Sequence, residues 1–169
     1  QKIEGFQSNT FIGTGFILAN AGSQSSDGYE FDLVMSPTES IDLAISGLFM
    51  DPIYDSFPNS AAGDLSGTMP SNISEDTISS TITWNWNTSN WDGYFRLSHL
   101  YASEAKLLEN PAWQSILESA GNGIKTQDTL NISAGLEKEN LSIMFWGKNI
   151  NDDKYLISAF PAVADPTFT

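Results

Sequence analysis

The sequence has no cysteine, a single histidine and few cations. Over 169 residues it carries 7 Lys and Arg against 21 Asp and Glu, a formal net charge of −14. Without cysteine, thiolate catalysis and a disulfide framework are excluded, and one histidine leaves few possible zinc sites. Seven scattered cations make no patch that could neutralise phosphates, which argues against nucleic-acid binding. No stretch reaches the ~20 apolar residues of a membrane-spanning helix.

Most polar side chains of the sequence are small and uncharged. Charged residues make up only 17% of the chain, below the usual ~25%, whereas Ser, Thr and Asn number 22, 12 and 13. The helix formers Ala, Leu, Glu and Lys are correspondingly scarce. This composition is typical of strands and loops.

Apolar and polar residues alternate with a period of two through most of the chain, which is the pattern of half-buried strands. The segment from Thr77 to Asn87 is the clearest, because Ile78, Ile82, Trp84 and Trp86 oppose Ser, Thr and Asn side chains. We predict seven strands, at Lys2–Gln7, Asp27–Met35, Ile41–Phe49, Thr77–Asn87, Gly93–Tyr101, Asp128–Lys138 and Leu141–Lys148.

The connections between these strands alternate in length. Short turns are expected at 36–40, 88–92 and 139–140, and long loops at 8–26, 51–76, 102–127 and from 149 onward. Antiparallel strands joined in this way place all tight turns on one rim and all long loops on the other, as in outer-membrane barrels. We therefore expect an all-β fold, an antiparallel up-and-down transmembrane β-barrel, present here as a partial barrel of about seven strands.

One long loop contains a helix signal. Asn110 can cap the helix, Pro111 suits its first position, and Gly121 can end it. Its expected apolar face is formed by Trp113, Ile116, Leu117 and Ala120.

Aromatic residues gather around one short turn. Trp84, Trp86, Trp91 and Tyr94 are expected to form a lipid-interface girdle at the headgroup level. The alternative is that the tryptophans form the core of a soluble β-sandwich. The alternation of loop lengths and the Ser, Thr and Asn on one strand face favour the barrel.

The sequence contains no acid, base and nucleophile in a catalytic arrangement, so we expect no enzyme and no cofactor. His99 has no partner pattern, and the aspartates 51, 55 and 64, or 152 and 153, do not follow the spacing of a calcium loop. Polar-face residues could line a lumen and contact solute or an internal plug. These speculative positions are Glu30, Asp32, Arg96, Asn131 and Lys148, of which Arg96 could clamp a carboxylate.

Two segments resemble TonB-dependent outer-membrane receptors. SIMFWGKNINDDKY (142–155) is similar to their penultimate strand and the loop after it, where an apolar strand leads to Asn, Asp and Tyr. NAGSQSSDGYEFDL (20–33) looks like a second family segment, with Tyr29 in place of the usual Val. The positions that carry the likeness are Gly28, Glu30, Trp146, Lys148, Asn149, Asp152 and Tyr155.

The resemblance implies a 22-stranded barrel, filled by an N-terminal plug and energised by TonB, that imports ferric siderophores, cobalamin or similar scarce solutes. Residues 1–169 would be the C-terminal portion of that barrel, strands fifteen to twenty-one. The plug, the TonB contact and the last strand would be absent, because the sequence stops at Phe168 and Thr169. Two open edges would then keep the fragment from inserting into lipid as a monomer.

The expected location is the outer membrane of a Gram-negative bacterium, with outer-membrane lipid, the plug of the same parent chain, TonB and a metal chelate as partners. The long loops are acidic, with Asp51, Asp55, Asp64, Glu75 and Asp76. By themselves they would not attract an anionic chelate. Two rival functions remain: a plugless, porin-like barrel, and a carbohydrate-binding sandwich with Trp84, Trp86, Trp91 and Trp113 as sugar platforms.

Overall fold

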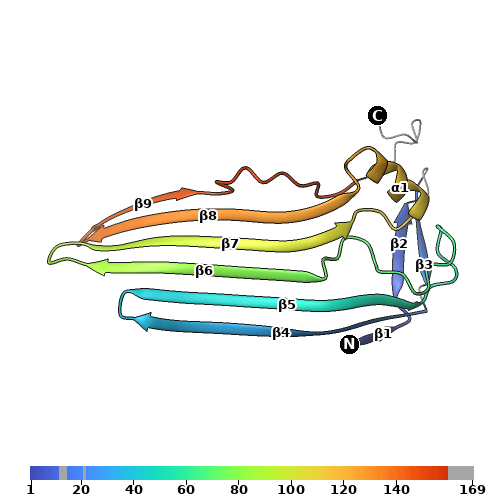
Figure 1. Cartoon of the computed structure of the whole chain (residues 1–169), viewed down its shortest axis with the longest axis horizontal. Helices are drawn as coiled ribbons and strands as arrows, with labels where there is room; N and C mark the ends of the chain where they lie inside the picture. Colours follow the sequence, from blue (N-terminus) through green and yellow to red (C-terminus); the bar gives the residue numbers. More distant parts are fainter. Residues whose placement is uncertain (12–14, 21, 160–169) are drawn as a thin grey trace.

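The computed structural model describes residues 1–11, 15–20 and 22–159. Ala21 of the second family segment and the last ten residues, including Phe168 and Thr169, lie outside this part. The described chain is all-β apart from one short helix, and its main feature is an antiparallel sheet of seven strands (Figure 1). The predicted fold class is confirmed to that extent.

The main sheet has the strand order β1-β4-β5-β6-β7-β8-β9, so that nearly every strand pairs with its neighbour in sequence. The sheet is open, because β1 and β9 are its two edges. A separate sheet consists of the hairpin β2-β3. The bounds are β1 Lys2–Glu4, β2 Gln7–Phe11, β3 Phe16–Asn20, β4 Ser23–Thr38, β5 Ile41–Ser56, β6 Asp76–Asn87, β7 Asp92–Lys106, β8 Ile124–Lys138 and β9 Leu141–Gly147.

The observed strands extend beyond the predicted ones toward the long loops. β5 has 16 residues and continues through Pro52, which a sequence pattern alone would place outside a strand. Pro52 is tolerated because the pairing of β5 with β6 ends at Phe49 and Asp76, so β5 is an edge strand beyond that point. On its other side β5 remains paired with β4 as far as Ser56.

The first predicted strand, Lys2–Gln7, is wrong as a single element. Gly5 has a positive φ of 67° and separates β1 from β2, and only β1 joins the main sheet. The hairpin β2-β3 was expected to be part of a loop. Its sequence is rich in Gly, Ser and Asn, which hid the two short strands among turn residues.

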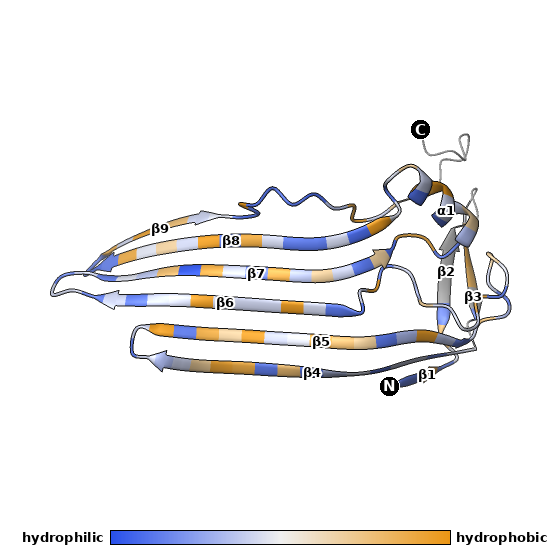
Figure 2. Ribbon diagram, in the orientation of Figure 1, coloured by the Kyte–Doolittle hydropathy of each residue, from blue (hydrophilic) through white to orange (hydrophobic). Residues whose placement is uncertain are grey.

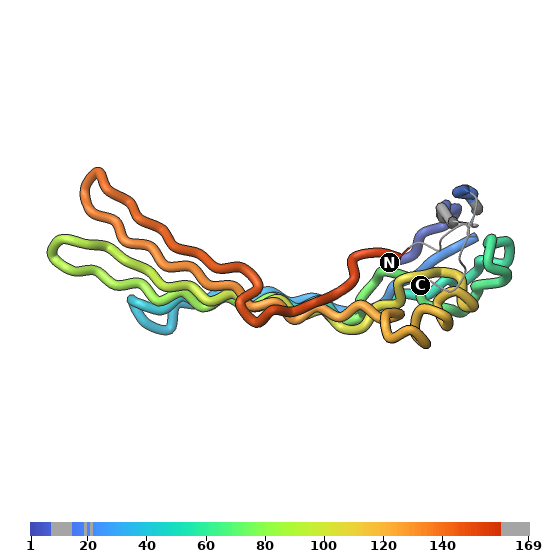
Figure 3. The backbone as a smooth tube through the Cα atoms, turned by 90° about the horizontal axis from the view of Figure 1, so that it is seen from above, coloured from blue at the N-terminus to red at the C-terminus, as the bar shows by residue number. Residues whose placement is uncertain are grey.

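The alternation of connection lengths is confirmed. The tight turns after β4, β6 and β8 lie together at one end of the sheet, whereas the long connections, α1 and the β2-β3 hairpin gather at the other (Figure 1). Figure 3 shows that the hairpins at the turn end splay out of a common plane. We call these two ends the turn end and the loop end.

The predicted helix is confirmed as α1, Pro111–Ser119, with Pro111 in its first turn. The side chain of Asn110 accepts hydrogen bonds from the amides of Ala112 and Trp113, at 3.0 and 3.3 Å. Its expected apolar face is only partly right, because Leu117 and Gln114 are buried while Ile116 is exposed. Gln114 is buried because its amide group bonds Leu108, Glu118 and Gly123.

The buried apolar side chains of the described residues lie at the loop end. Tyr54, Phe57 and Leu65 form one cluster, with the rings of Tyr54 and Phe57 5.1 Å apart. Leu107 and Leu117 are buried in the neighbouring β7–β8 connection. This loop-end core joins segments that are far apart in sequence, so the long connections fold as a structured layer.

Candidate functional site

The strand register divides the sheet into two chemically different faces. Directly paired residues share a face, so the pairs Leu43–Ile82, Ile82–Leu97 and Leu97–Ile132 continue one apolar row across four strands. The apolar face comprises Tyr29, Phe31, Leu33, Met35, Ile41, Leu43, Ile45, Phe49, Ile78, Ile82, Trp84, Trp86, Phe95, Leu97, Tyr101, Leu130, Ile132, Ala134, Leu136, Leu141, Ile143 and Phe145.

No described element covers this apolar face. Twelve of its 22 side chains are exposed, from 37% for Tyr101 to 68% for Phe145, and the other ten are half-buried. The alternating colours along each strand in Figure 2 reflect the same division between faces. Water-soluble folds bury such a face against a second layer, and contiguous apolar patches of this extent mark a binding surface or a membrane contact.

Aromatic residues border the apolar face at both ends. Near the turns, the rings of Trp84 and Trp86 lie 5.0 Å apart, and Trp86 covers Gly93, where a Cβ would lie only 2.3 Å from the ring. Toward the loops, Tyr29 stacks on Phe49 at 4.9 Å, and Tyr101 occupies β7. The sequence reading missed this second aromatic row because its members are spread over three strands.

The other two residues of the predicted girdle lie elsewhere. Tyr94 is on the polar face, since it pairs with Asn85 and Gly135, and its ring lies over Gly135. Trp91 is in the β6–β7 turn, where Lys138 lies 5.7 Å from its ring centroid. Only Trp84 and Trp86 therefore belong to the apolar face, with Phe95 paired directly to Trp84.

The polar face carries four of the five predicted lumen residues, whereas Lys148 lies just after the end of β9. Glu30 and Asp32 are exposed on β4, whereas Asn131 on β8 is half-buried. Arg96 is held by its own neighbours: its Nε donates to Thr83 Oγ1 at 3.1 Å, and its guanidinium lies 5.6 Å from the Tyr94 centroid. The carboxylate clamp expected of Arg96 would have to compete with these contacts.

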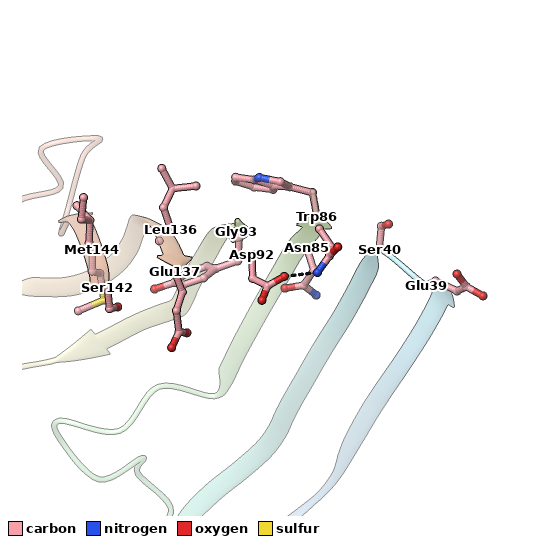
Figure 4. A pocket seen from close by; sticks show the side chains of 14 residues that line it. Glu39, Ser40, Asn85, Trp86, Asp92, Gly93, Leu136, Glu137, Ser142 and Met144 are labelled. Atoms are coloured by element: carbon pink, nitrogen blue, oxygen red, sulfur yellow. Dashed lines mark hydrogen bonds between the residues drawn. The ribbon is translucent and has the colours of Figure 1, made fainter. Parts of the chain in front are cut away.

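A hollow of about 650 Å³ lies near the turn end of the sheet (Figure 4). The side chains of Asn85, Asp92 and Glu137 point to one side of the strands, and those of Trp86 and Leu136 to the other. Asp92 accepts a hydrogen bond from Asn87. The lining of the hollow includes Glu39, Asp92 and Glu137 and no lysine or arginine, so the hollow is acidic.

A buried polar network at the loop end was not predicted. The Tyr54 hydroxyl donates to Glu109 Oε1 at 2.7 Å, and the amide and hydroxyl of Ser71 donate to the same oxygen at 3.3 Å. Glu109 Oε2 is buried without a hydrogen-bond partner among the described residues. These residues follow no sequence motif. Glu109 lies 38 positions from Ser71 and 55 positions from Tyr54 in the sequence.

The family-motif positions have local roles in the structure. A Cβ at Gly28 would lie 2.0 Å from the Phe49 carbonyl oxygen, so glycine permits β4 and β5 to approach closely. Lys148 Nζ lies 5.8 Å from the exposed Trp146 ring, and Lys125 Nζ lies 5.9 Å from Tyr155. Asp152 forms an exposed ion pair with Lys154 at 3.1 Å.

Asn149 contacts β8, and so do two neighbours for which the sequence predicted no such contact. Asn151 and Asp153 both accept hydrogen bonds from β8 amides. The sequence signal for this contact was the placement of Asn149, Asn151 and Asp153 at every second position.

The acidic and histidine candidates are not assembled into a metal site. His99 Nε2 lies 2.6 Å from Asp128 Oδ1, and Asp55 accepts from the Ser25 hydroxyl. Within the part of the chain that the structure describes, no three His, Asp or Glu side chains are grouped to hold a metal ion. Hydrogen bonds from the Ser66 hydroxyl and amide lower the pKa of exposed Asp64.

Comparison of the chain with protein-family models, curated proteins and solved structures gave no match. Among the described residues, no helix has the length and apolar character to cross a membrane. The functional assignment therefore depends on the geometry of the two sheet faces.

Proposed function

We propose that this chain is part of the wall of an outer-membrane β-barrel, the C-terminal portion of a TonB-dependent receptor that imports a scarce solute such as a ferric siderophore. The observation that carries the proposal is the apolar face, which continues from β4 to β9 and is covered by no described element. Its occupant is the hydrocarbon of the outer membrane.

The dimensions of the face suit a membrane. Along β6 it runs from Ile78 to Trp86, ~26 Å at a rise of ~3.3 Å per residue. A strand tilt of ~40° reduces this height to ~20 Å, near the ~25 Å apolar band of outer-membrane barrels. The aromatic pairs at its two ends lie where such barrels place their girdles.

The opposite face is suited to water or protein. Thr81 donates to Ser98 at 3.1 Å, and the row continues through Asn131, which pairs with Ser98. Such a face lines a lumen, where the plug of the same parent chain would contact it and TonB would act from the turn side. The acidic loops do not attract an anionic chelate, so cationic contacts to such a solute belong to other parts of the parent protein.

The carbohydrate-binding alternative needs tryptophans on one accessible surface. Trp84 and Trp86 lie on the apolar face near the turns, whereas Trp113 is in α1 at the loop end (Figure 1). The two groups cannot form one sugar platform. The second sheet, the β2-β3 hairpin, also lies at the loop end and leaves the apolar face uncovered.

These 169 residues contain no cysteine, and a direct test uses the complete protein with any cysteine elsewhere replaced. Single cysteines at Ile82 and Thr81, neighbours on opposite faces of β6, should differ in the complete protein expressed in outer membranes. We expect a bimane label at position 82 to be quenched by brominated lipid, and its matched control at 81 to be quenched only by a water-soluble agent. Equal aqueous quenching at both positions would reject a lipid-facing band.

The receptor and the plugless porin are separated by a second measurement. Cells dependent on the complete protein for a ferric chelate should lose uptake when TonB is deleted, because active transport needs that energy source. Uptake that persists without TonB would favour the porin-like barrel, while leaving the assignment of the lipid-facing strands intact.

A further inference from the structure

The chain after β9 stays beside β8 without forming a strand. β9 pairs with β8 only as far as the pair Ile132–Gly147, although β8 continues to Ile124 (Figure 1). Residues 149–153 then run along the β8 edge. We call this segment the clasp.

The clasp satisfies the backbone of β8 mainly with side chains. Asn151 Oδ1 accepts from the Leu130 amide at 2.9 Å, and Asp153 Oδ2 accepts from the Asp128 amide at 2.7 Å. Asn151 Nδ2 in turn donates to the Asp128 carbonyl oxygen. One backbone bond adds to these, from the Ile150 amide to the Leu130 carbonyl at 2.8 Å. The backbone groups of Asp128 and Leu130 that a longer β9 would have bonded are thus already occupied.

Asn149 shapes the clasp from inside. Its side chain bonds both the amide and the carbonyl of Asp153 at 2.9 Å, and its own amide donates to Asn131 Oδ1. Asn149 and Asp152 have positive φ values of 51° and 53°. Asn and Asp tolerate this left-handed conformation better than other residues with a side chain, and a strand cannot pass through it. Asn149 and Asp152 therefore end the strand, and Asn151 and Asp153 between and beside them supply the bonds that replace it.

We propose that the clasp is a built-in strand terminator, which limits β9 to seven residues and closes the loop-side edge of β8 to pairing with any other strand. Free strand edges invite pairing with other chains, and proteins block them by occupying their donors and acceptors. The clasp also directs the chain that follows toward the loop end, where Tyr155 meets Lys125. This role depends on the local contacts and holds whether or not the sheet lies in a membrane.

Residue-resolved amide hydrogen exchange of the chain in detergent micelles tests the proposal. The double variant Asn151→Ala/Asp153→Ala should accelerate exchange at the amides of Asp128 and Leu130 at least tenfold. Exchange at Leu97 and Ile132, within the paired part of the sheet, should be unchanged, which also shows that the variant is folded. The matched control Asp152→Asn removes the charge that pairs with Lys154 but keeps a residue that tolerates the positive φ, and it should change neither amide.

The conservative variant Asp153→Asn keeps an acceptor oxygen and should retain protection at Asp128. Unchanged exchange at Asp128 and Leu130 in the double variant would overturn the proposal, because their protection would then come from another source. Equal acceleration in Asp152→Asn would also overturn it, since the effect would reflect general loosening of the segment.

Discussion

The two ends of the molecule place their apolar side chains in opposite ways. At the loop end, Tyr54, Phe57 and Leu65 are at most 3% exposed and pack on one another. Along the sheet, side chains of the same kind stay open, with Trp84 at 54% and Phe145 at 68%. The loop end is stabilised by a core of its own, whereas the sheet presents its apolar surface to its surroundings. The lipid, detergent or water around the protein should therefore control the stability of the sheet but not that of the loop-end core.

The largest expected effect comes from the loop-end core. Phe57→Ala removes a ring that is 0% exposed, and we expect the free energy of unfolding to fall by ~3–5 kcal/mol, from lost burial and the cavity left behind. The matched variant Phe95→Ala, at 40% exposure on the apolar face, should cost less than half as much. Urea unfolding in detergent micelles measures both. Equal losses would show that the two regions are packed alike.

A charge on the apolar face should have the next largest effect. Ile82→Lys places an ammonium group where hydrocarbon is proposed, and outer-membrane barrels lose ~2–4 kcal/mol for Lys at the bilayer midplane. Thr81→Lys, its neighbour on the polar face, should be nearly neutral. Folding of the complete protein into lipid vesicles measures the difference. Equal losses of stability in the two lysine variants would show that the two faces of the sheet do not differ in their surroundings.

A variant of the N-cap of α1 tests the stability of the loop end without altering the loop-end core. Asn110→Ala removes the acceptor for the amides of Ala112 and Trp113, which should cost ~1 kcal/mol of stability. Asn110→Asp, which keeps an acceptor, serves as the control. Protease cleavage within the 107–123 connection should accelerate in the alanine variant only, and unchanged cleavage would show that the cap does not hold this connection.

The smallest effect concerns pH at the loop end. The lowered pKa of Asp64 stabilises the fold above the ordinary aspartate pKa of ~4, and this contribution is lost as the pH falls through the folded value. Carbon-detected NMR titration should give Asp64 a midpoint below the ordinary aspartate pKa. Ser66→Ala removes the hydroxyl contribution and should raise the midpoint. An unchanged midpoint in that variant would assign the shift to the backbone amide alone.

Local patterns predicted a large part of the fold. Alternation located six of the seven strands of the main sheet, and Asn110 with Pro111 located α1 within a residue or two. The turns were equally readable, because each is short and polar. These features depend on neighbours within a few positions along the chain.

The length of the strands could not be read in this way. β5 continues through Pro52 because β4 remains its partner there. The alternation within β4 or within β5 does not reveal how far the two strands stay paired. The clasp is similar, because the sequence does not show that Asn151 and Asp153 bond the amides of β8.

The sequence by itself determined the alternation of faces, because the side-chain period of a strand is two whatever its partners are. It also determined the order of short and long connections. The tertiary structure alone decided that the apolar faces of six strands join into one surface and that Tyr54 meets Glu109. These outcomes depend on register and on contacts between distant segments, where a shift of one residue would exchange the two faces.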